Sequence, residues 1–420
     1  MSAAEDGAGP SLPPLGRNRD FLVLWSGQAV SELGSSMSVL VFPIVGYAIT
    51  GSATLAGLAT TAVIVGGVVT RLPAGALVDR WSRSRVLLAA NVVAALAYAS
   101  LGAAALAGAL TLGHLIAVGV VSGVCDALLS PAAAAAVRTI VPPPQLPLAF
   151  TRLEARQHGA ELIGPPVGGA LYSAGRSIPF LVDAASYLVA AASVLLLRTP
   201  LRPPAREGAP SRVVADITEG VRFFWRQRAL RAIILWGALV NFAVTLVLVL
   251  VTLRLVRAGV HPAAIGAIDT IGAVSALAGA LLAPRIVQRA RTGATTIVSG
   301  LLIGGSIVPM AWTTNVVAIG ALLAAGFFLL PANNAGISAY MASLTPDGMQ
   351  GRLNGAAGFL AEGLRTAGPV LAGVLLAALG GTGATLVGAG CAAASLLPLV
   401  LSGEVRRLDR PDRWPVAVQS

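Results

Sequence analysis

GALVDRWSRSR, residues Gly75 to Arg85, is a short polar segment between two long apolar runs of the chain. The run before it, 53–76, has Arg71 as its one charged residue, and the run after it, 86–110, has none. Each run is longer than the roughly 20 apolar residues that an α-helix needs to cross a bilayer. The segment between them is therefore predicted to lie at a membrane surface, and its arginines indicate the cytoplasmic one.

The composition of the whole chain also indicates a membrane protein. Of its 420 residues, 56% are hydrophobic and 11% are charged, which is less than half the charged share of an ordinary soluble domain. The apolar runs are continuous rather than alternating, which favours helices over a membrane barrel. Reading these runs along the chain predicts twelve spans, at about 21–49, 53–78, 85–109, 112–137, 147–174, 178–198, 229–256, 263–287, 293–311, 315–343, 351–380 and 382–402.

All the basic residues are arginines, and they divide by side of the membrane. With twelve spans in place, 24 of the 29 fall in segments predicted to be cytoplasmic, and three, Arg176, Arg254 and Arg257, fall in predicted outer loops. Positive residues accumulate on the cytoplasmic side, so both termini are predicted to be cytoplasmic and the protein to lie in the cytoplasmic membrane. The net charge of +11 is explained by this orientation signal and by attraction to anionic lipid headgroups, without a nucleic-acid partner.

The two halves of the chain are similar at an offset of about 204 residues. The segment IGPPVGGALYSAG (163–175) corresponds to AGPVLAGVLLAALG (367–380), with Gly164-Pro165 opposite Gly368-Pro369 and Gly169 opposite Gly373. Six spans, a polar connector and six further spans are what transporters built from parallel repeats show. The sequence therefore predicts two bundles of six helices related by a pseudo-two-fold axis.

The predicted bundles occupy residues 21–198 and 229–402, with polar cytoplasmic tails at 1–20 and 403–420. The first tail lacks an apolar core, so it is expected to be disordered and not to be a signal peptide. The first part of the connector, 199–228, is rich in proline and charge and is predicted to be extended. Its second part places apolar residues at helical spacing opposite arginines, which predicts an amphipathic helix on the cytoplasmic membrane surface.

Polar side chains inside the first, fourth, seventh and tenth predicted spans indicate a water-filled cavity. A charged residue in a span costs roughly 2.5–3.5 kcal/mol on insertion scales unless it meets water, a partner or a proton. Glu32 lies one turn after Gln28, and Asp126 lies between two serines on its helix face, so both acids are candidates for binding a proton. The uncharged candidates for a substrate cavity, for which helix–helix hydrogen bonding or apolar packing is the alternative, are Gln28, Trp236, Asn241, Thr245, Asn333, Asn334 and Ser338.

Further charged residues lie in the fifth and eleventh spans. Glu154, His158 and Glu161 share one face of a helix. The first two are expected to be solvated at the cytoplasmic surface, and Glu161 is expected to lie deeper. The repeat places Glu161 opposite Arg365, which follows Glu362 by one turn. We therefore expect a charge cluster that joins spans 5 and 11.

Two more acids and two cysteines lie in apolar surroundings. Asp269, in the eighth span, is a further candidate proton site, with structural pairing as the alternative. Asp183 follows Pro179 closely and is expected to lie near the outer end of the sixth span. Cys125 and Cys391 are expected to be small packing residues.

The sequence carries none of the short motifs of common enzymes. It has no glycine loop of the P-loop type, no nucleophile elbow and no metal-ligand spacing among its three scattered histidines. We therefore expect no enzyme activity, no cofactor and no metal. Any transport is expected to draw on ion or solute gradients.

The Gly75–Arg85 segment resembles the loop between helices 2 and 3 of the major facilitator superfamily. Gly75, Asp79, Arg80, Arg83 and Arg85 match its pattern, while a serine stands at position 82, where glycine is usual. The resemblance implies a gating motif in which the aspartate helps to close the cytoplasmic side. It also implies that spans 1, 4, 7 and 10 line a central cavity.

The run GPPVGG, 164–169, is similar to the antiporter motif in span 5 of drug–proton exporters of that superfamily. Gly164, Pro165, Gly168 and Gly169 match, and Ala160 replaces a preceding glycine of the fuller motif. Taken with LWSGQAVSELGSSM (24–37) in the first span, the chain looks like the multidrug, macrolide and siderophore exporter branch. The resemblance covers about residues 19–402.

These features predict a secondary active transporter that works by alternating access and exports an amphiphilic small molecule in exchange for protons. The expected partners are that substrate, the proton and membrane lipid, and the protein is expected to function as a monomer. One alternative is a nutrient importer or uniporter, which would follow if the span 5 motif only packs helices. The other is a non-transporting membrane receptor or assembly partner, for which the acids inside the spans have no use.

The arginine distribution gives a direct prediction of topology. In a chain whose Cys125 and Cys391 are replaced, a single cysteine at Gly208 of the connector should be labelled by a membrane-impermeant maleimide only after the cells are opened. The measurement compares labelling of intact and permeabilised cells. Labelling at Gly208 in intact cells would contradict the twelve-span arrangement.

Overall fold

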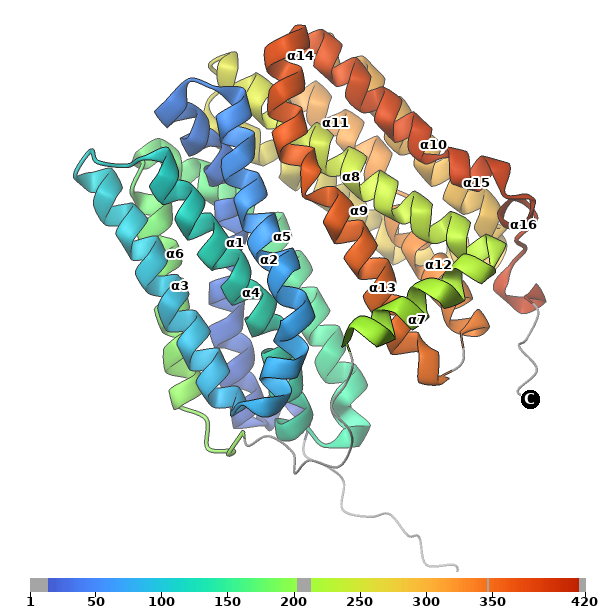
Figure 1. Ribbon diagram of the computed structural model, residues 1–420, viewed down its shortest axis with the longest axis horizontal. Helices are drawn as coiled ribbons and strands as arrows, with labels where there is room; N and C mark the ends of the chain where they lie inside the picture. Colours follow the sequence, from blue (N-terminus) through green and yellow to red (C-terminus); the bar gives the residue numbers. More distant parts are fainter. Residues whose placement is uncertain (1–13, 202–212, 346, 415–420) are drawn as a thin grey trace, which may run out of the picture.

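The computed structural model describes residues 14–201, 213–345 and 347–414, and within them the side chains at 72–73, 75–80, 213–217, 220, 347–352, 354 and 412 lie outside the described part. All regular structure in these ranges is helical, and the helices form two bundles (Figure 1). The N-terminal bundle consists of α1 (Arg19–Thr50), α2 (Ala53–Arg80), α3 (Arg83–Leu106), α4 (Leu112–Ile140), α5 (Leu146–Ala174) and α6 (Ile178–Leu195). The C-terminal bundle consists of α8 (Arg228–Arg257), α9 (Pro262–Arg289), α10 (Thr292–Met310), α11 (Val316–Phe327), α12 (Leu330–Leu344), α13 (Asp347–Arg365), α14 (Ala367–Ser395) and α15 (Leu397–Leu401).

These helices account for twelve crossings. Ten stretches of the described chain are long and apolar enough to cross a membrane. To these the charged helix α5 adds one crossing, and the long last stretch divides into two at Gly380, whose φ of +68° interrupts α14. Two crossings are each made of a pair of helices, α11 with α12 and α13 with α14. The linking residues Phe328, Leu329 and Thr366 keep right-handed helical φ and ψ angles.

Local signals in the sequence explain where several helices begin and end. The side chain of Asn18 caps α1 by accepting a hydrogen bond of 3.0 Å from the amide of Phe21. Gly51 ends the same helix with a φ of +64°, a left-handed conformation that glycine adopts without strain. The carboxylate of Asp20 accepts the backbone amide of Thr199 at 2.8 Å, which ties the start of α1 to the end of the first bundle.

Each bundle has its own buried core. In the N-terminal bundle, Phe42 packs edge-on against Tyr98 and Phe180, and Tyr98 stacks on Tyr187 with ring centroids 5.7 Å apart. In the C-terminal bundle, α8 is the central helix, and buried aliphatic residues line it from end to end. A helix that is apolar on all sides is stable only inside a larger protein or in lipid.

The second part of the connector forms α7 (Val213–Arg226), which lies against the C-terminal bundle at one end (Figure 1). Its Phe224 is buried with Leu230 of α8 and Leu353 of α13. Its Trp225 remains exposed. The helix therefore packs one apolar face on the bundle and presents another to its surroundings.

The segment after the last crossing also folds onto the C-terminal bundle, through α16 (Gly403–Arg406) and a 3-10 turn, Pro411–Arg413. Asp409 lies 3.5 Å from Arg291 and 3.6 Å from Arg413. The backbone amide of Arg410 donates to its carboxylate, and together with these arginines it holds the pKa of Asp409 below its usual range. Trp414 packs on Tyr340 of α12 with ring centroids 5.4 Å apart.

Candidate functional site

The two bundles meet at one end through glycines that bring backbones into contact. A Cβ atom added to Gly169 of α5 would lie 2.8 Å from the carbonyl carbon of Pro262, at the start of α9. A Cβ atom added to Gly373 of α14 would lie 2.6 Å from Thr54 Cα, at the start of α2. Real Cβ atoms do not approach backbone atoms so closely, so only glycine fits at these positions.

The same contacts are reciprocated from the facing helices. An added Cβ at Gly266 of α9 would lie 2.7 Å from Pro166 Cα, and one at Gly57 of α2 would lie 2.8 Å from the carbonyl carbon of Pro369. The pairs α5–α9 and α14–α2 therefore repeat one arrangement in the two halves. We call these two pairs the glycine seam.

The antiporter-like motif contributes to the seam from one face and to its own bundle from the other. Gly164 and Gly168 face α1, where an added Cβ on either would lie 3.0 Å from backbone atoms of Met37. Gly169 faces α9 across the seam, and so does the carbonyl of Pro165. The helix continues through Pro165 without interruption, so in this structure the motif acts by close packing and not by a break.

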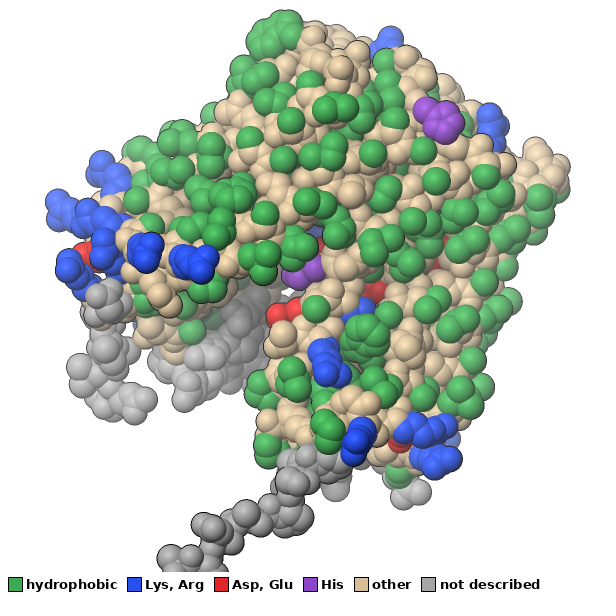
Figure 2. Space-filling view, turned by 180° about the vertical axis from the view of Figure 1, so that it is seen from behind, with side chains coloured by type: hydrophobic (Ala, Val, Ile, Leu, Met, Phe, Trp, Pro, Cys, Tyr) green, Lys and Arg blue, Asp and Glu red, His purple; other side chains and the backbone are tan. Residues whose placement is uncertain are grey.

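At the opposite end the bundles are spread apart, as Figure 1 shows for the end where α7 lies. Figure 2 shows a notch between the two lobes there, with histidine, acidic and basic side chains at its inner part. Polar residues near the middles of several helices are correspondingly exposed. These exposed mid-helix residues are Asp126, His158, Glu161, Asn241, Asn334 and Ser338.

On the N-terminal wall of this cavity, Glu32 is paired with an arginine. The Nε atom of Arg156, on α5, donates to the Glu32 carboxylate at 2.6 Å, and only 12% of the Arg156 side chain is exposed. The pair joins α1 to α5.

Asp126 lies beside this pair on α4 and connects to a buried set of hydroxyl groups. Tyr187 donates to its carboxylate at 3.3 Å, and the Tyr187 hydroxyl lies 2.8 Å from that of Ser35. Among the residues that the structure describes, Asp126 makes no ion pair with an arginine. An exposed carboxylate at this depth is suited to exchange protons with water in the cavity.

Asp183 lies behind Asp126 and is fully buried, with 0% of its surface exposed. Ser38 donates to its carboxylate at 2.5 Å and Ser186 at 3.2 Å. No arginine is paired with it in the described parts of the chain. The sequence had placed Asp183 near the outer end of its helix, and the missed signal is the run of serines on α1 that faces it.

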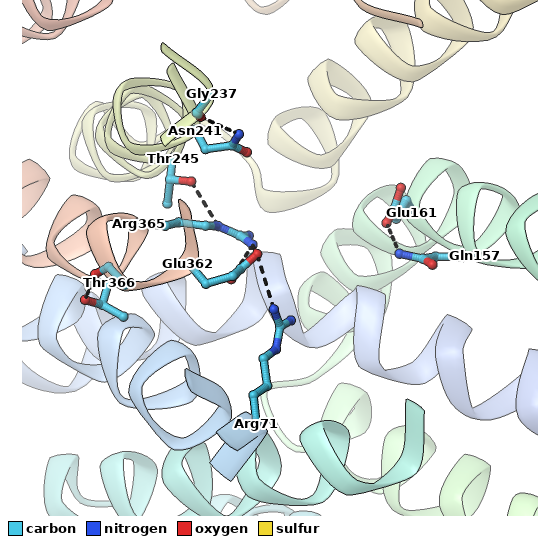
Figure 3. A network of polar contacts seen from close by, with 10 residues as sticks. Arg71, Gln157, Glu161, Gly237, Asn241, Thr245, Glu362, Arg365 and Thr366 are labelled. Carbon is cyan, nitrogen blue, oxygen red and sulfur yellow. Dashed lines mark hydrogen bonds and ion pairs between the residues drawn. The ribbon is translucent and has the colours of Figure 1, made fainter. Parts of the chain in front are cut away.

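On the opposite wall, three charged side chains form one cluster across the two bundles (Figure 3). Arg71 of α2 lies 3.7 Å from Glu362 of α13, and Arg365 lies 3.4 Å from the same carboxylate. Arg365 also donates to Thr245 of α8 at 3.1 Å. The cluster therefore joins crossings 2, 7 and 11.

The expected cluster between spans 5 and 11 is not formed. Glu161 contacts its own helix, at 3.1 Å from Gln157 and 3.1 Å from His158. Figure 3 shows it across a gap from Arg365. The repeat predicts equivalent positions for Glu161 and Arg365, and the two side chains lie on opposite sides of the cavity.

Several other predicted residues lie away from the cavity surface. Trp236 is buried in the C-terminal core with 3% of its surface exposed, and Gln28 and Asn333 are also buried. Asp269 is partly buried, and its carboxylate makes no hydrogen bond or ion pair with the other described residues. Arg254, expected in an outer loop, is buried within α8 and donates to Met310 O, Thr385 Oγ1 and Thr313 O.

Of the gating motif, Arg83 and Arg85 fall in the described part. Arg83 donates to the carbonyl of Ala135 at 3.3 Å and to the hydroxyl of Thr139 at 2.5 Å, which fixes the start of α3 to the end of α4. Arg85 is exposed. The side chains of Asp79 and Arg80 and the surroundings of Gly75 lie outside the described residues.

The sequence is similar to that of one kind of curated exporter. Over 225 residues it is 25% identical to macrolide efflux protein A of Streptococcus pyogenes, a match that covers 53% of this chain and 55% of the relative. A second strain of the same species, serotype M6, has a protein of the same name with the same match. The chain thus spans about half the length of the curated relatives it matches.

Solved structures of transporters share the fold at low identity. A bacterial homologue of the human lysosomal transporter Spinster, inward-facing and unoccupied, gives a TM-score of 0.71 at 15% identity, over 96% of this chain and 100% of that one. The nucleoside transporter NupG, in a mutant form, gives 0.71 at 13% identity over 91% and 99%. The human organic anion transporter MFSD10 gives 0.61 at 16% identity over 92% and 100%.

The predicted fold class, an all-helical membrane protein with the major facilitator fold, is confirmed by these likenesses. The family model described as Major Facilitator Superfamily matches residues 24–369, most of the chain. Members of this family are transporters and not enzymes, as the sequence predicted. The chain belongs to the major facilitator superfamily.

Proposed function

We propose that this transporter exports an amphiphilic small molecule from the cytoplasm in exchange for protons. The observation that carries the proposal is the arrangement of the cavity, which is open at the end where α7 lies and sealed by the glycine seam at the other. The distribution of arginines predicts that the open end faces the cytoplasm. The protein would then be in the state that admits a substrate from inside the cell.

The acidic residues of the N-terminal wall supply the coupling in this proposal. Asp126 is exposed to the cavity and has a hydroxyl partner, whereas Glu32 is held by Arg156. Protonation of Asp126 from the outside, followed by release to the cytoplasm, would tie one inward proton to one cycle of the bundles. The Glu32–Arg156 pair would hold α1 and α5 together while the bundles rock.

Two observations support export: the similarity to macrolide efflux protein A and the composition of the glycine seam. Macrolide efflux protein A is named as an exporter, and the motif that resembles drug–proton antiporters here builds half of the seal. A nucleoside transporter shares the fold equally well, so import is the second candidate. The fold alone gives no direction.

Vesicle transport separates the two candidates. We expect radiolabelled erythromycin to accumulate in inside-out membrane vesicles with an acidic lumen, and the accumulation to be lost when a protonophore collapses the gradient. Vesicles from cells without the protein give the background. Accumulation in right-side-out vesicles with an acidic exterior, and none in inside-out vesicles, would show import.

A further inference from the structure

Arg71 and Arg365 combine exposed side chains with hydrogen-bond donors that are not used. They share one carboxylate, Glu362, and their side chains are 57% and 42% exposed. Arg365 donates from Nε to Thr245 and from Nη1 to Glu362. Among the described residues, its Nη2 and the whole guanidinium of Arg71 donate no hydrogen bond.

Two other arginines of the bundles show what a structural role looks like in this chain. Arg254 is 9% exposed, and its two terminal nitrogens donate to three oxygen atoms. Arg156 is 12% exposed and makes a short bond of 2.6 Å with Glu32. Both have little contact with water, and both terminal nitrogens of Arg254 are hydrogen-bonded. Arg71 and Arg365 are instead exposed and still have open donors.

The charges of the cluster do not balance. Two guanidinium groups and one carboxylate leave one positive charge on this wall of the cavity. A net positive charge attracts an anion, and water around the exposed arginines screens part of that attraction. Figure 3 shows Arg71, Glu362 and Arg365 in line, with Asn241 and Thr245 of α8 beside them.

We propose that Arg71 and Arg365 form a subsite for one anionic group, a carboxylate or phosphate, of an amphiphilic ligand. The guanidinium fork matches the two oxygens of such a group. Because the arginines belong to different bundles, an anion that displaces Glu362 would bridge the bundles on this wall. This inference rests on the proposed function, and it adds anionic amphiphiles as a ligand class to the cationic macrolide with which that function is tested.

The wall that faces the arginines determines how the anionic ligand is oriented in the cavity. Glu161 and Gln157 lie on α5 across the gap from the arginines (Figure 3). A carboxylate there repels an anion, so the anionic group binds on the arginine side, and the rest of the ligand extends into the cavity. An uncharged relative of the ligand lacks this anchor.

A matched set of fluorescent probes tests the subsite in the purified full chain, held in phosphatidylcholine nanodiscs. The probes are N-dansyl-leucine, which has one carboxylate, its uncharged methyl ester, and the cation dansylcadaverine. We expect the wild type to bind the acid roughly tenfold more tightly than the ester, as for one charge-assisted contact. Arg365→Gln and Arg71→Gln should each remove most of this preference and leave ester binding unchanged. Arg176→Gln, at an exposed outer loop, removes the same charge outside the cavity and should leave it intact.

The variant Glu362→Gln makes the test specific. It removes the competing carboxylate while both arginines remain, so binding of the acid should become several times tighter. Equal binding of acid and ester by the wild type would overturn the proposal, as would an equal loss in Arg176→Gln. Weaker binding of the acid in Glu362→Gln would also overturn it.

Nanodiscs that contain phosphatidylglycerol distinguish the two sources of the anion. If acid binding is unchanged in them, the subsite takes a soluble organic anion. If it is weakened in the wild type but not in Arg365→Gln, the subsite takes a lipid headgroup. These equilibrium measurements do not depend on protons or on the direction of transport, so a failure of the export proposal leaves them interpretable.

Discussion

Replacing Asp126 by asparagine is expected to abolish proton-driven export while substrate binding remains measurable. The amide keeps the size of the carboxylate and can still accept the hydrogen bond from Tyr187, but it cannot take up or release a proton. Export in vesicles with an acidic lumen should fall to the level of vesicles without the protein. Exchange of substrate in the absence of a pH gradient should continue, because it needs no net proton movement.

The control for this variant is Asp126→Glu, which keeps a titratable group on the same face of α4 and should retain part of the gradient-driven activity. Similar export rates in the wild type and in Asp126→Asn would return Asp126 to a purely structural role. The measurement needs equal amounts of protein in the membranes. Asp126 is exposed to the cavity, so the change should affect folding little.

Glu32→Gln tests proton coupling less directly than Asp126→Asn does, although the sequence made both acids candidates for binding a proton. Arg156 is 12% exposed and donates to Glu32 at 2.6 Å, so removal of the carboxylate leaves an uncompensated charge inside the bundle. Breaking one partner of such a pair destabilises a protein more than replacing both. A loss of export in Glu32→Gln is therefore informative only beside the double variant Glu32→Gln with Arg156→Gln.

The fold could be predicted from the sequence because a bilayer permits few arrangements of the polypeptide backbone. Length and continuity of the apolar runs set the number of crossings, and the repeat at 204 residues set the two bundles. The repeat also identified Gly169 and Gly373 as equivalent, and both make close backbone contacts between the bundles. What it could not supply is the partner of each glycine, since a repeat relates equivalent positions and not positions in contact.

The site was less predictable because side-chain environment in a membrane protein depends on which face of a helix meets water, lipid or protein. Trp236 lies on α8, whose residues are mostly apolar, and the structure places it in the core, away from Asn241 and Thr245. Asp183 is near the start of α6, yet α1 covers it with Ser38. Arg71 meets Glu362 across 291 positions of sequence, which no local pattern encodes.

The seal at the end opposite the cavity should be highly sensitive to a single side chain. In Gly373→Val, the new Cβ would stand 2.6 Å from backbone atoms of Ala53 and Thr54, which belong to the other bundle. Backbone atoms cannot move aside as the end of a flexible side chain can, so α14 and α2 must separate at this contact. Overpacking of this kind costs about 1–3 kcal/mol, and about 2.6 kcal/mol is enough to move a two-state population from 9:1 to 1:9.

The expected result of Gly373→Val is therefore a shift toward the state open at the seam, with transport strongly reduced and expression retained. A single cysteine at Asn241, which is exposed in the cavity, reports the shift. Its labelling by an impermeant maleimide in intact cells should rise by up to about ninefold, as the outward-open fraction rises from a tenth to nine tenths.

Gly390→Val is the matched control for this experiment, because it makes the same substitution at a helical glycine where an added Cβ would meet no atom within 4 Å, in the last crossing, beyond the interruption of α14 at Gly380. Both substitutions replace a helical glycine by valine and change the intrinsic helix propensity equally. A difference between them thus reports the seam and not the helix. If Asn241→Cys is labelled at the same rate in the two variants, the glycine seam does not control which side of the cavity is open. The close backbone contacts of α14 with α2 would then serve to pack the bundles together in every state of the cycle.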